Sequence, residues 1–401
     1  MKTKHSAVST PASHPSNAGT NAVNTAVNEA VNATHYSASA IVLPVPEPLA
    51  PGLPLPHRKV IRSWLAPLSR GTVAHSIILL SVDWLVFASL IVGVVLISAL
   101  WLKLLLGAAA GFMIGRLFIL GHDACHMSFT PNRKLNQWLG RIAFLPSLTP
   151  YSLWDVGHNV VHHGYTNLKG VDFVWEPRSV EEFAALPAWR RTLERIYRSG
   201  WAPWLYYLVE IWWLKMYFPS KERMPTRRSA FMWDGLLVTA VAAMWSAALL
   251  WAAQLTHQSA WLLWSTGFLL PFIFWNGMIG FVVYVHHTHT SVAWYDDKNI
   301  WAKAQPFVST TVHLTFSKGV GALLHHIMEH TAHHVDMSIP LYHLKQAQQL
   351  LEHALPDRIV IQRFSWKWYF ETAQRCKLYD FKARCWLDFA GKQTAAPVVL
   401  V

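Results

Sequence analysis

Residues 84–102 have the sequence WLVFASLIVGVVLISALWL, which contains no Asp, Glu, Lys or Arg. A helix rises about 1.5 Å per residue, so this run would cover about 28 Å, close to the thickness of the hydrocarbon core of a bilayer. A second apolar tract, 104–121, follows directly after Lys103 and is interrupted only by Arg116. We therefore predict two membrane-spanning helices at about 84–102 and 104–121, joined by a very tight turn.

A second pair of spans is predicted between Asp234 and Asp296, where 61 residues contain no acidic side chain, Lys or Arg. The polar break at 256–259 divides this tract into spans at about 235–255 and 260–285. The whole chain is 53% apolar and only 14% charged, with a mean hydropathy of +0.22, which excludes an ordinary soluble enzyme. The predicted fold is an all-α, multi-pass integral membrane protein with four transmembrane helices in two hairpins.

The distribution of charge predicts the orientation in the membrane. Residues 127–233 contain 14 Lys and Arg side chains, whereas the two short turns contain only Lys103. By the positive-inside rule this segment is cytoplasmic, so we expect a cytosolic helical cap that carries the histidine clusters described below. The aromatic stretch 201–218 is interpreted as lying in the membrane interface, because a fifth span would place the clusters on opposite sides.

The remaining parts of the chain are assigned from composition. Residues 1–56, rich in Ala, Asn, Ser, Thr and Pro, are predicted to be a disordered N-terminal tail, followed by a membrane domain at 57–355. Residues 356–401 are assigned as a C-terminal cytosolic tail, in which 358–386 is basic and aromatic. Amphipathic packing is the preferred interpretation of that segment, and binding of a partner protein or of anionic headgroups is the alternative.

Histidine is the main anomaly, because the chain contains 22 of them. Thirteen fall into four clusters, at 122–126, 158–163, 286–289 and 325–334. Side chains three or four residues apart share a helix face, so the pairs His122/His126, His158/His162 and His330/His333 are each predicted to face one metal ion. The adjacent His163 and His334 would direct an imidazole toward a second ion, which predicts a two-metal site. The scattered histidines are interpreted as ordinary residues: His57, His75, His257, His313, His343 and His353.

The ligand type alone does not select the metal, since sets of imidazoles suit Zn, Cu, Fe or Ni. The chain has neither the Glu-x-x-His pairs of soluble di-iron bundles nor a His-Glu-x-x-His motif. What remains is a histidine-rich centre at a membrane surface, beside apolar helices that can hold a lipid chain. Oxygen chemistry on an unactivated hydrocarbon is the natural use of such a centre.

Four motifs carry a specific resemblance: GHDACHMSF, GHNVVHHGYTN and HHIMEHTAHH, with HHTHTSVAWYDD before the last of them. Together they resemble the histidine boxes of integral membrane fatty acid desaturases, in particular the acyl-lipid Δ12/ω-6 and ω-3 branch, over about residues 60–350. The resemblance leaves the roles of His286 and His326 open. The iron ligands that it implies are His122, His126, His158, His162, His163, His287, His289, His325, His330, His333 and His334, and of the pair His287 and His289 one is expected to bind iron.

Metal-bound imidazoles are normally oriented by hydrogen bonds from neighbouring groups. Five polar residues close to the boxes are candidates for this role, with plain solvation at the surface as the alternative for each: Asp123, Asp155, Asn159, Asp172 and Glu329.

The resemblance also implies a reaction. Two iron ions with O2 as co-substrate would remove hydrogen from adjacent methylenes of a fatty acyl chain, linked to lipid, CoA or ACP, and leave a cis double bond. The chain has no Gly-x-Gly-x-x-Gly motif and no His-Pro-Gly-Gly haem motif, so an external electron donor, ferredoxin or cytochrome b5-like, is expected. The net charge of +12 suits an acidic donor and membrane lipid, and we expect no nucleic-acid partner.

Two other functions remain open at this point. One is an acetylenase, hydroxylase or ketolase that uses the same centre on another lipid. The other is a non-enzymatic metal transporter or store, for which ligands strung across the membrane would be expected. The sequence leaves the chain length of the substrate, its carrier and the position of the double bond open.

Overall fold

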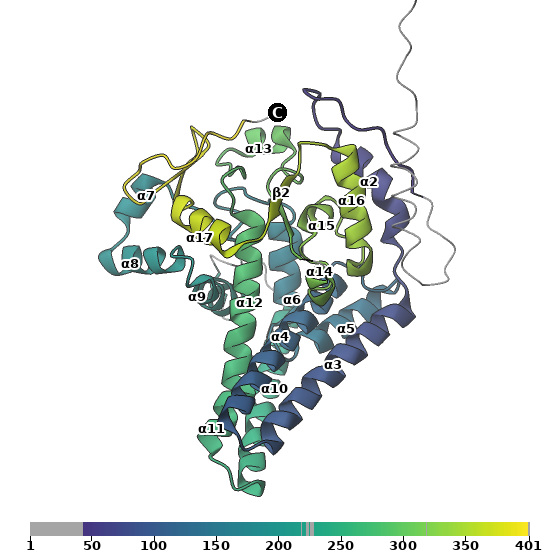
Figure 1. Cartoon of the computed structure of the whole chain (residues 1–401), viewed down its shortest axis with the longest axis vertical. Coiled ribbons are helices and arrows are strands. Elements are labelled where there is room, and N and C mark those ends of the chain that lie inside the picture. Colours follow the sequence, from purple (N-terminus) through teal and green to yellow (C-terminus); the bar gives the residue numbers. More distant parts are fainter. Residues whose placement is uncertain (1–42, 218, 222–223, 225–227, 318, 400–401) are drawn as a thin grey trace, which may run out of the picture.

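The computed structural model describes residues 43–399, except for 218, 222–223, 225–227 and 318. Most of the predicted disordered tail, residues 1–42, therefore lies outside the described residues. Long helices extend from one end of the molecule, and a cap of shorter elements occupies the other end (Figure 1). The metal-ligand candidates lie where the long helices enter the cap.

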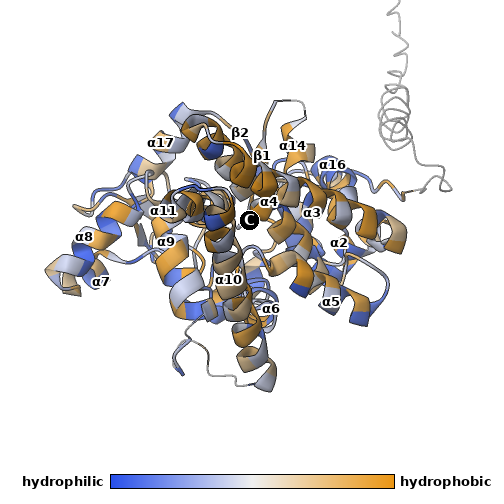
Figure 2. Cartoon of the chain, turned by 90° about the horizontal axis from the view of Figure 1, so that it is seen from below, coloured by the Kyte–Doolittle hydropathy of each residue, from blue (hydrophilic) through white to orange (hydrophobic). Residues whose placement is uncertain are grey.

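Within these described residues, four helices are long and apolar enough to cross a membrane, as the sequence predicted. They are α3 (Val73–Leu96), α4 (Leu100–Cys125), α10 (Ser229–Leu255) and a composite fourth helix. The composite consists of α11 (Ala260–Trp264), the π-helical η4 (Ser265–Leu269) and α12 (Leu270–His287). Their residues are largely hydrophobic (Figure 2), which fits a lipid surrounding.

The boundaries of the first hairpin differ from the prediction. Helix α3 begins at Val73 and continues through Asp83, because Arg116 of α4 neutralises this buried carboxylate at 2.8 Å. The break between α3 and α4 lies at residues 97–99 rather than at Lys103. Lys103 is buried inside α4, and its ammonium group donates to the carbonyl of Val94 in the last turn of α3. The last carbonyls of a helix lack partners within the helix, so a cation is stabilised there.

Helix α4 lies at the centre of the membrane part and approaches α12 very closely. A Cβ atom added at Gly111 would lie 2.6 Å from Cβ of Phe274, and one added at Gly115 would lie 2.3 Å from Sδ of Met278. Small residues at such positions allow two membrane helices to pack backbone against backbone. This contact fixes the ends of α4 and α12 beside each other, where His122 and His287 lie.

The cap is built from short helices with intervening loops. Residues 201–217 contribute α9 (Pro203–Tyr206) and the π-helical η3 (Tyr207–Tyr217), which pack against α12 and are not among the four candidate spans. The other helical elements of the cap are α2 (Arg58–Leu65), η1 (Ala66–Ser69), α5 (Arg133–Phe144), α6 (Tyr151–Asp155), η2 (Val156–His162), α7 (Val180–Ala185), α8 (Ala188–Tyr197), α13 (Lys298–Ala304), α14 (Val320–Leu323), α15 (His330–Val335), η5 (Leu341–His343), α16 (Leu344–Ala354) and α17 (Trp366–Arg375).

Strand structure is limited to two small pairs in the described residues. β1 (Val312–Thr315) is parallel to β2 (Val360–Arg363), with Val312 opposite Val360. β3 (Leu378–Asp380) is antiparallel to β4 (Cys385–Leu387). The protein is therefore essentially all-α, as predicted.

Both segments assigned as tails are packed on the cap where the structure describes them. The amide of Leu49 donates to the carbonyl of Ala354 at 2.9 Å. In the C-terminal segment, the indole of Trp386 donates to the carbonyl of His289 at 2.9 Å, and α17 buries Tyr369. Residues 43–56 and 356–399 are thus parts of the cap, and the preferred interpretation of 358–386 as a packed amphipathic segment agrees with the structure.

Candidate metal centre

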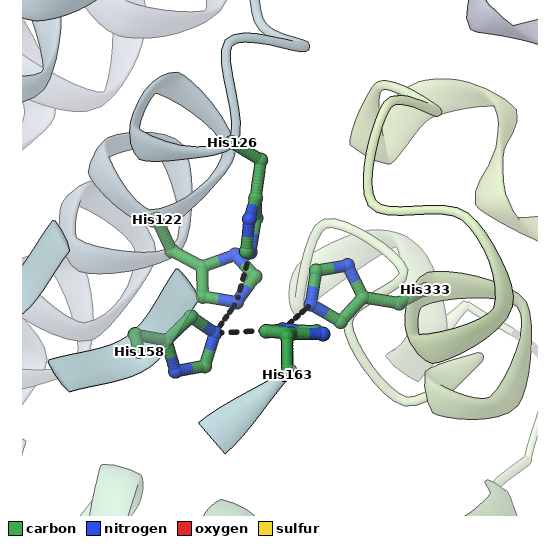
Figure 3. A group of neighbouring side chains, drawn as sticks. All are labelled: His122, His126, His158, His163 and His333. Carbon is green, nitrogen blue, oxygen red and sulfur yellow. Dashed lines mark hydrogen bonds between the residues drawn. The ribbon is translucent and has the colours of Figure 1, made fainter. Parts of the chain in front are cut away.

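Nine histidines from four segments converge at the boundary between the long helices and the cap. They form two groups in which the candidate ligand nitrogens all lie within 4.8 Å of one another. Figure 3 shows the first group, in which five rings from α4, η2 and α15 point toward a common centre. Group one comprises His122, His126, His158, His163 and His333, and group two comprises His162, His287, His330 and His334.

The spacing of the ring nitrogens in group one fits a metal ion. The Nε2 atom of His122 lies 3.3 Å from Nε2 of His126 and 3.0 Å from Nε2 of His158, and His163 Nε2 lies 3.0 Å from His158 Nε2 and 3.1 Å from His333 Nε2. Ligands held about 2.1 Å from a metal at right angles are about 3.0 Å apart. A neutral imidazole nitrogen either donates or accepts, so this ring of contacts is better satisfied by a central cation than by hydrogen bonds.

In group two, hydrogen bonds hold the outer nitrogens of three of the four rings, and Nδ1 of His330 is buried without a partner. Nδ1 of His162 lies 3.0 Å and 3.1 Å from the two oxygens of Asp172, which is fully buried. Nδ1 of His287 lies 3.3 Å from the carbonyl of Thr310. Each acceptor keeps the proton on Nδ1, which leaves the lone pair of Nε2 free to bind a metal.

Thr166 holds another ring of group two. Its hydroxyl donates to the carbonyl of His162 at 2.8 Å and accepts from Nδ1 of His334 at 3.2 Å. Nε2 of His334 is buried and has no hydrogen-bond partner. A buried polar atom without a partner is costly, and a metal ion would satisfy it.

Burial also favours the protonation state that binds metal. Loss of solvation, followed by repulsion from neighbouring imidazoles, holds the pKa values of the group members in the cap well below the usual histidine value. At neutral pH these rings are uncharged and carry a free lone pair. The rings concerned are those of His158, His163, His330, His333 and His334.

The structure divides two of the sequence clusters differently from the prediction. In the π-helical η2, the amide of His163 donates to the carbonyl of His158 at 2.9 Å, so residues five apart share a face. His158 and His163 therefore belong to group one and His162 to group two, which corrects the predicted pair His158/His162. In α15, His330 belongs with His334 rather than with His333.

Two of the predicted ligands, His289 and His325, lie outside both groups. His325 Nε2 contacts a carboxylate oxygen of Asp83 at 2.7 Å, so this ring is tied to α3. His289 Nδ1 accepts the amide hydrogen of Ser291 at 3.0 Å, and its Nε2 faces Gln362. The set of candidate ligands is therefore revised to the nine histidines of the two groups.

The two histidines whose roles the sequence left open are also outside the groups. His286 stacks on His330 with ring centroids 3.7 Å apart, and its Nε2 lies 3.2 Å from Sδ of Met328. His326 Nδ1 lies 3.0 Å from a carboxylate oxygen of Glu329.

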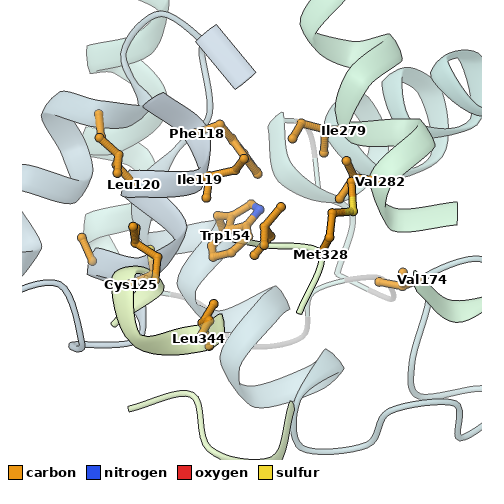
Figure 4. Packing of buried hydrophobic residues seen from close by; sticks show 14 of the residues in the cluster. Phe118, Ile119, Leu120, Cys125, Trp154, Val174, Ile279, Val282, Met328 and Leu344 are labelled. Atoms are coloured by element: carbon orange, nitrogen blue, oxygen red, sulfur yellow. The ribbon is translucent and has the colours of Figure 1, made fainter. Parts of the chain in front are cut away.

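An apolar cavity borders both groups on the side of the long helices. It lies among α4, α6, η2, η3 and α12, and imidazoles of both groups form part of its wall. Figure 4 shows the packing of several lining side chains, including Phe118, Ile119, Trp154, Ile279 and Val282. Such a lining favours a hydrocarbon and excludes water.

Comparison with known proteins identifies the family. The model of the family described as fatty acid desaturase matches residues 99–366. The chain belongs to the fatty acid desaturase family. It is 27% identical over 339 residues to the omega-6 fatty acid desaturase, chloroplastic, of Spinacia oleracea, covering 82% of this chain and 72% of that protein. It is 30% identical over 286 residues to the sn-1 oleoyl-lipid 12-desaturase of a Picosynechococcus species, covering 71% and 78%.

Of the candidate orienting residues of this desaturase, one contacts an imidazole of the two groups and the other four contact different partners. Of the five, Asp172 binds a group imidazole directly, whereas Asp123 accepts from Ser128 and the amide of Leu341. Asn159 donates to Asp155 at 2.6 Å and to the carbonyl of Cys125, which ties η2 to the end of α4. Glu329 binds His326 instead of a group member.

Sequence reasoning missed three residues that hold the imidazoles of the desaturase. Thr166 and Thr310 accept from Nδ1 atoms, and Trp154 stacks on His158 with ring centroids 4.0 Å apart. Thr166 lies four residues after His162 within the same motif, and that spacing is a signal for a shared helix face. For Thr310, which acts through its backbone carbonyl, the side chain carries no signal.

Proposed function

We propose that this integral membrane desaturase introduces a cis double bond into a lipid-linked acyl chain, using O2 and two electrons at a di-iron centre held by the two histidine groups. The observation that carries the proposal is that both groups open onto one apolar cavity. The relatives named as oleoyl-lipid 12-desaturases make an oleoyl lipid the first substrate to test.

The overall reaction converts –CH2–CH2– and O2, with two electrons and two protons, into –CH=CH– and two waters. Iron bound to the two groups would supply the oxidising power that an unactivated methylene requires. The residues of the chain bind the iron, orient the imidazoles and position the substrate. Neutral imidazoles donate lone pairs, the Asp172 carboxylate holds the ring of His162, and the apolar lining keeps an acyl chain beside the histidines.

The proposed orientation places the cap and both ends of the chain in the cytoplasm, where a reduced donor protein is available. It is supported by the excess of Lys and Arg in residues 127–233 over the turns between the spans. Reporter fusions placed after Arg228 and at the C-terminus should both report a cytoplasmic location. A reporter on the opposite side at either point would contradict this orientation.

The reaction is tested by expressing the chain in a host that lacks the product and by analysing total fatty acids by gas chromatography with mass spectrometry. We expect fatty acids two hydrogens lighter, with one new internal double bond. His333→Ala should abolish the product while the protein still inserts, and purified wild type should contain about two Fe per chain. The matched control is His353→Ala, since His353 lies in α16 outside both groups.

Other products would contradict the proposal in identifiable ways. Hydroxylated or triple-bonded fatty acids would show that the same centre performs a different oxidation. Binding of one Zn without iron would exclude oxygen chemistry of this kind.

A further inference from the structure

A second pocket, which shares no lining residue with the apolar cavity, also reaches the histidine centre. It lies between the beginning of α2 and the end of α13, and it reaches His163 of group one. Figure 1 shows α2 and α13 in the cap, away from the α11 end of the long helices. The substrate cavity and this pocket therefore approach the centre from different directions.

The lining of the pocket is cationic. Arg58 and Lys303 contribute permanent positive charges, and no carboxylate is among the described residues that line it. Lys59 is exposed beside it on α2. Helix α13 itself contains no acidic residue, and Asp297 caps its opposite end, where the carboxylate accepts the amide hydrogens of Asn299 and Ile300.

A short path of contacts connects the pocket with group two. The indole Nε1 of Trp301, a half-buried residue of the pocket wall, donates to the carbonyl of Thr166 at 2.8 Å. The hydroxyl of the same Thr166 lies 3.2 Å from Nδ1 of His334. Arg58 donates to the carbonyl of His334 at 2.7 Å. One residue, Thr166, thus separates a surface aromatic side chain from a candidate metal ligand.

We propose that this pocket is the docking site of an acidic one-electron carrier protein and that electrons enter through Trp301 and Thr166. The inference rests on the proposed function, which requires two external electrons. Two carrier molecules dock one after the other, and each is oxidised by one electron. The two electrons, two protons and the two hydrogens removed from the acyl chain together reduce one O2 to two waters. Cationic side chains around the pocket attract an acidic partner and orient it.

The experiment uses full-length, iron-loaded protein in detergent, with an acidic plant-type [2Fe–2S] ferredoxin as the probe. Binding is measured by calorimetry with oxidised ferredoxin. Reduction of the protein's iron is followed by stopped-flow absorbance after mixing with reduced ferredoxin. The double variant Lys59→Glu/Lys303→Glu should bind the ferredoxin about tenfold more weakly, with a smaller dependence on salt. Lys382→Glu is the control, because Lys382 is exposed on the loop between β3 and β4.

Trp301 is tested separately. Trp301→Leu should slow iron reduction several-fold even at saturating ferredoxin, where weaker binding no longer limits the rate, and Trp301→Phe should retain more of the rate. Reduction by dithionite, which needs no protein docking, should be the same in all variants. A structural defect would instead change the dithionite reaction as well.

The outcomes separate the two proposals. If the wild type is reduced by both agents but the Lys variants keep wild-type affinity for ferredoxin, the docking site is refuted and the proposed function stands. If dithionite reduces the iron but no double bond forms in a bound oleoyl lipid, the proposed function fails. The binding measurement still decides whether the pocket receives the carrier.

Discussion

The replacement Asp172→Asn tests the assignment of group two. The two carboxylate oxygens of Asp172 face His162 Nδ1 at 3.0 and 3.1 Å, and they also accept the amide hydrogens of Asn167 at 2.8 Å and Val174 at 3.1 Å. Each oxygen therefore faces a backbone donor in addition to the ring. An asparagine amide has to point its NH2 group at one of these donors in either orientation.

The size of the effect follows from these contacts. The variant loses a hydrogen bond to a charged acceptor, worth about 1.5–3 kcal/mol, in a fully buried position. Because about 1.4 kcal/mol corresponds to a factor of ten, metal affinity at group two should fall about 10- to 100-fold. Group one has no hydrogen bond to Asp172 and should keep its ion.

The assay is iron content per chain after dialysis against a graded series of chelator concentrations. Wild type should lose its iron at high chelator concentration, whereas Asp172→Asn should lose about half of it at a concentration 10- to 100-fold lower. Asp155→Asn is the matched control, since Asp155 binds Asn159 and no imidazole. Identical chelator curves for wild type and Asp172→Asn would refute the role of this carboxylate.

Three further outcomes are expected. His289→Ala should keep full iron content and product yield, because this ring lies outside both groups; loss of iron, measured by elemental analysis, would return it to the ligand set. Thr166→Val should weaken iron binding about tenfold in a chelator titration, because His334 Nδ1 loses its acceptor, and an unchanged titration would contradict this. Gly157→Val should reduce product yield from oleoyl lipid, because an added Cβ lies 2.6 Å from Cε of Met216 at the cavity wall; an unchanged fatty acid profile would show that the acyl chain does not pass there.

The four spans were predictable because the absence of charge over about 20 residues is a strong signal by itself. Their exact ends were not, because a charge inside a span is tolerated when a partner neutralises it. The carboxylate of Asp83 forms a salt bridge with Arg116, and the ammonium group of Lys103 donates to the carbonyl of Val94. Both contacts join α3 to α4, so they cannot be read from a linear pattern of charges.

The nine candidate ligands were all among the predicted residues, eight of them from clustered histidines whose spacing is rare by chance and His287 from the family resemblance. Their division into two groups was not predictable in full. The rule of three or four residues assumes an α-helix, and η2 has π-helical hydrogen bonds that place His158 and His163 on one face. His289 and His325 were included through the resemblance, and their rings bind other partners.

Both histidine groups include residues of α15, which follows the fourth span in the sequence. During synthesis, neither group can be completed until the fourth span has inserted and residue 334 has left the ribosome. A chain with its spans in place and its imidazoles still apart must therefore exist in the membrane for some time. Iron can be held by the complete groups only after that point, so metal loading has to follow insertion of the spans.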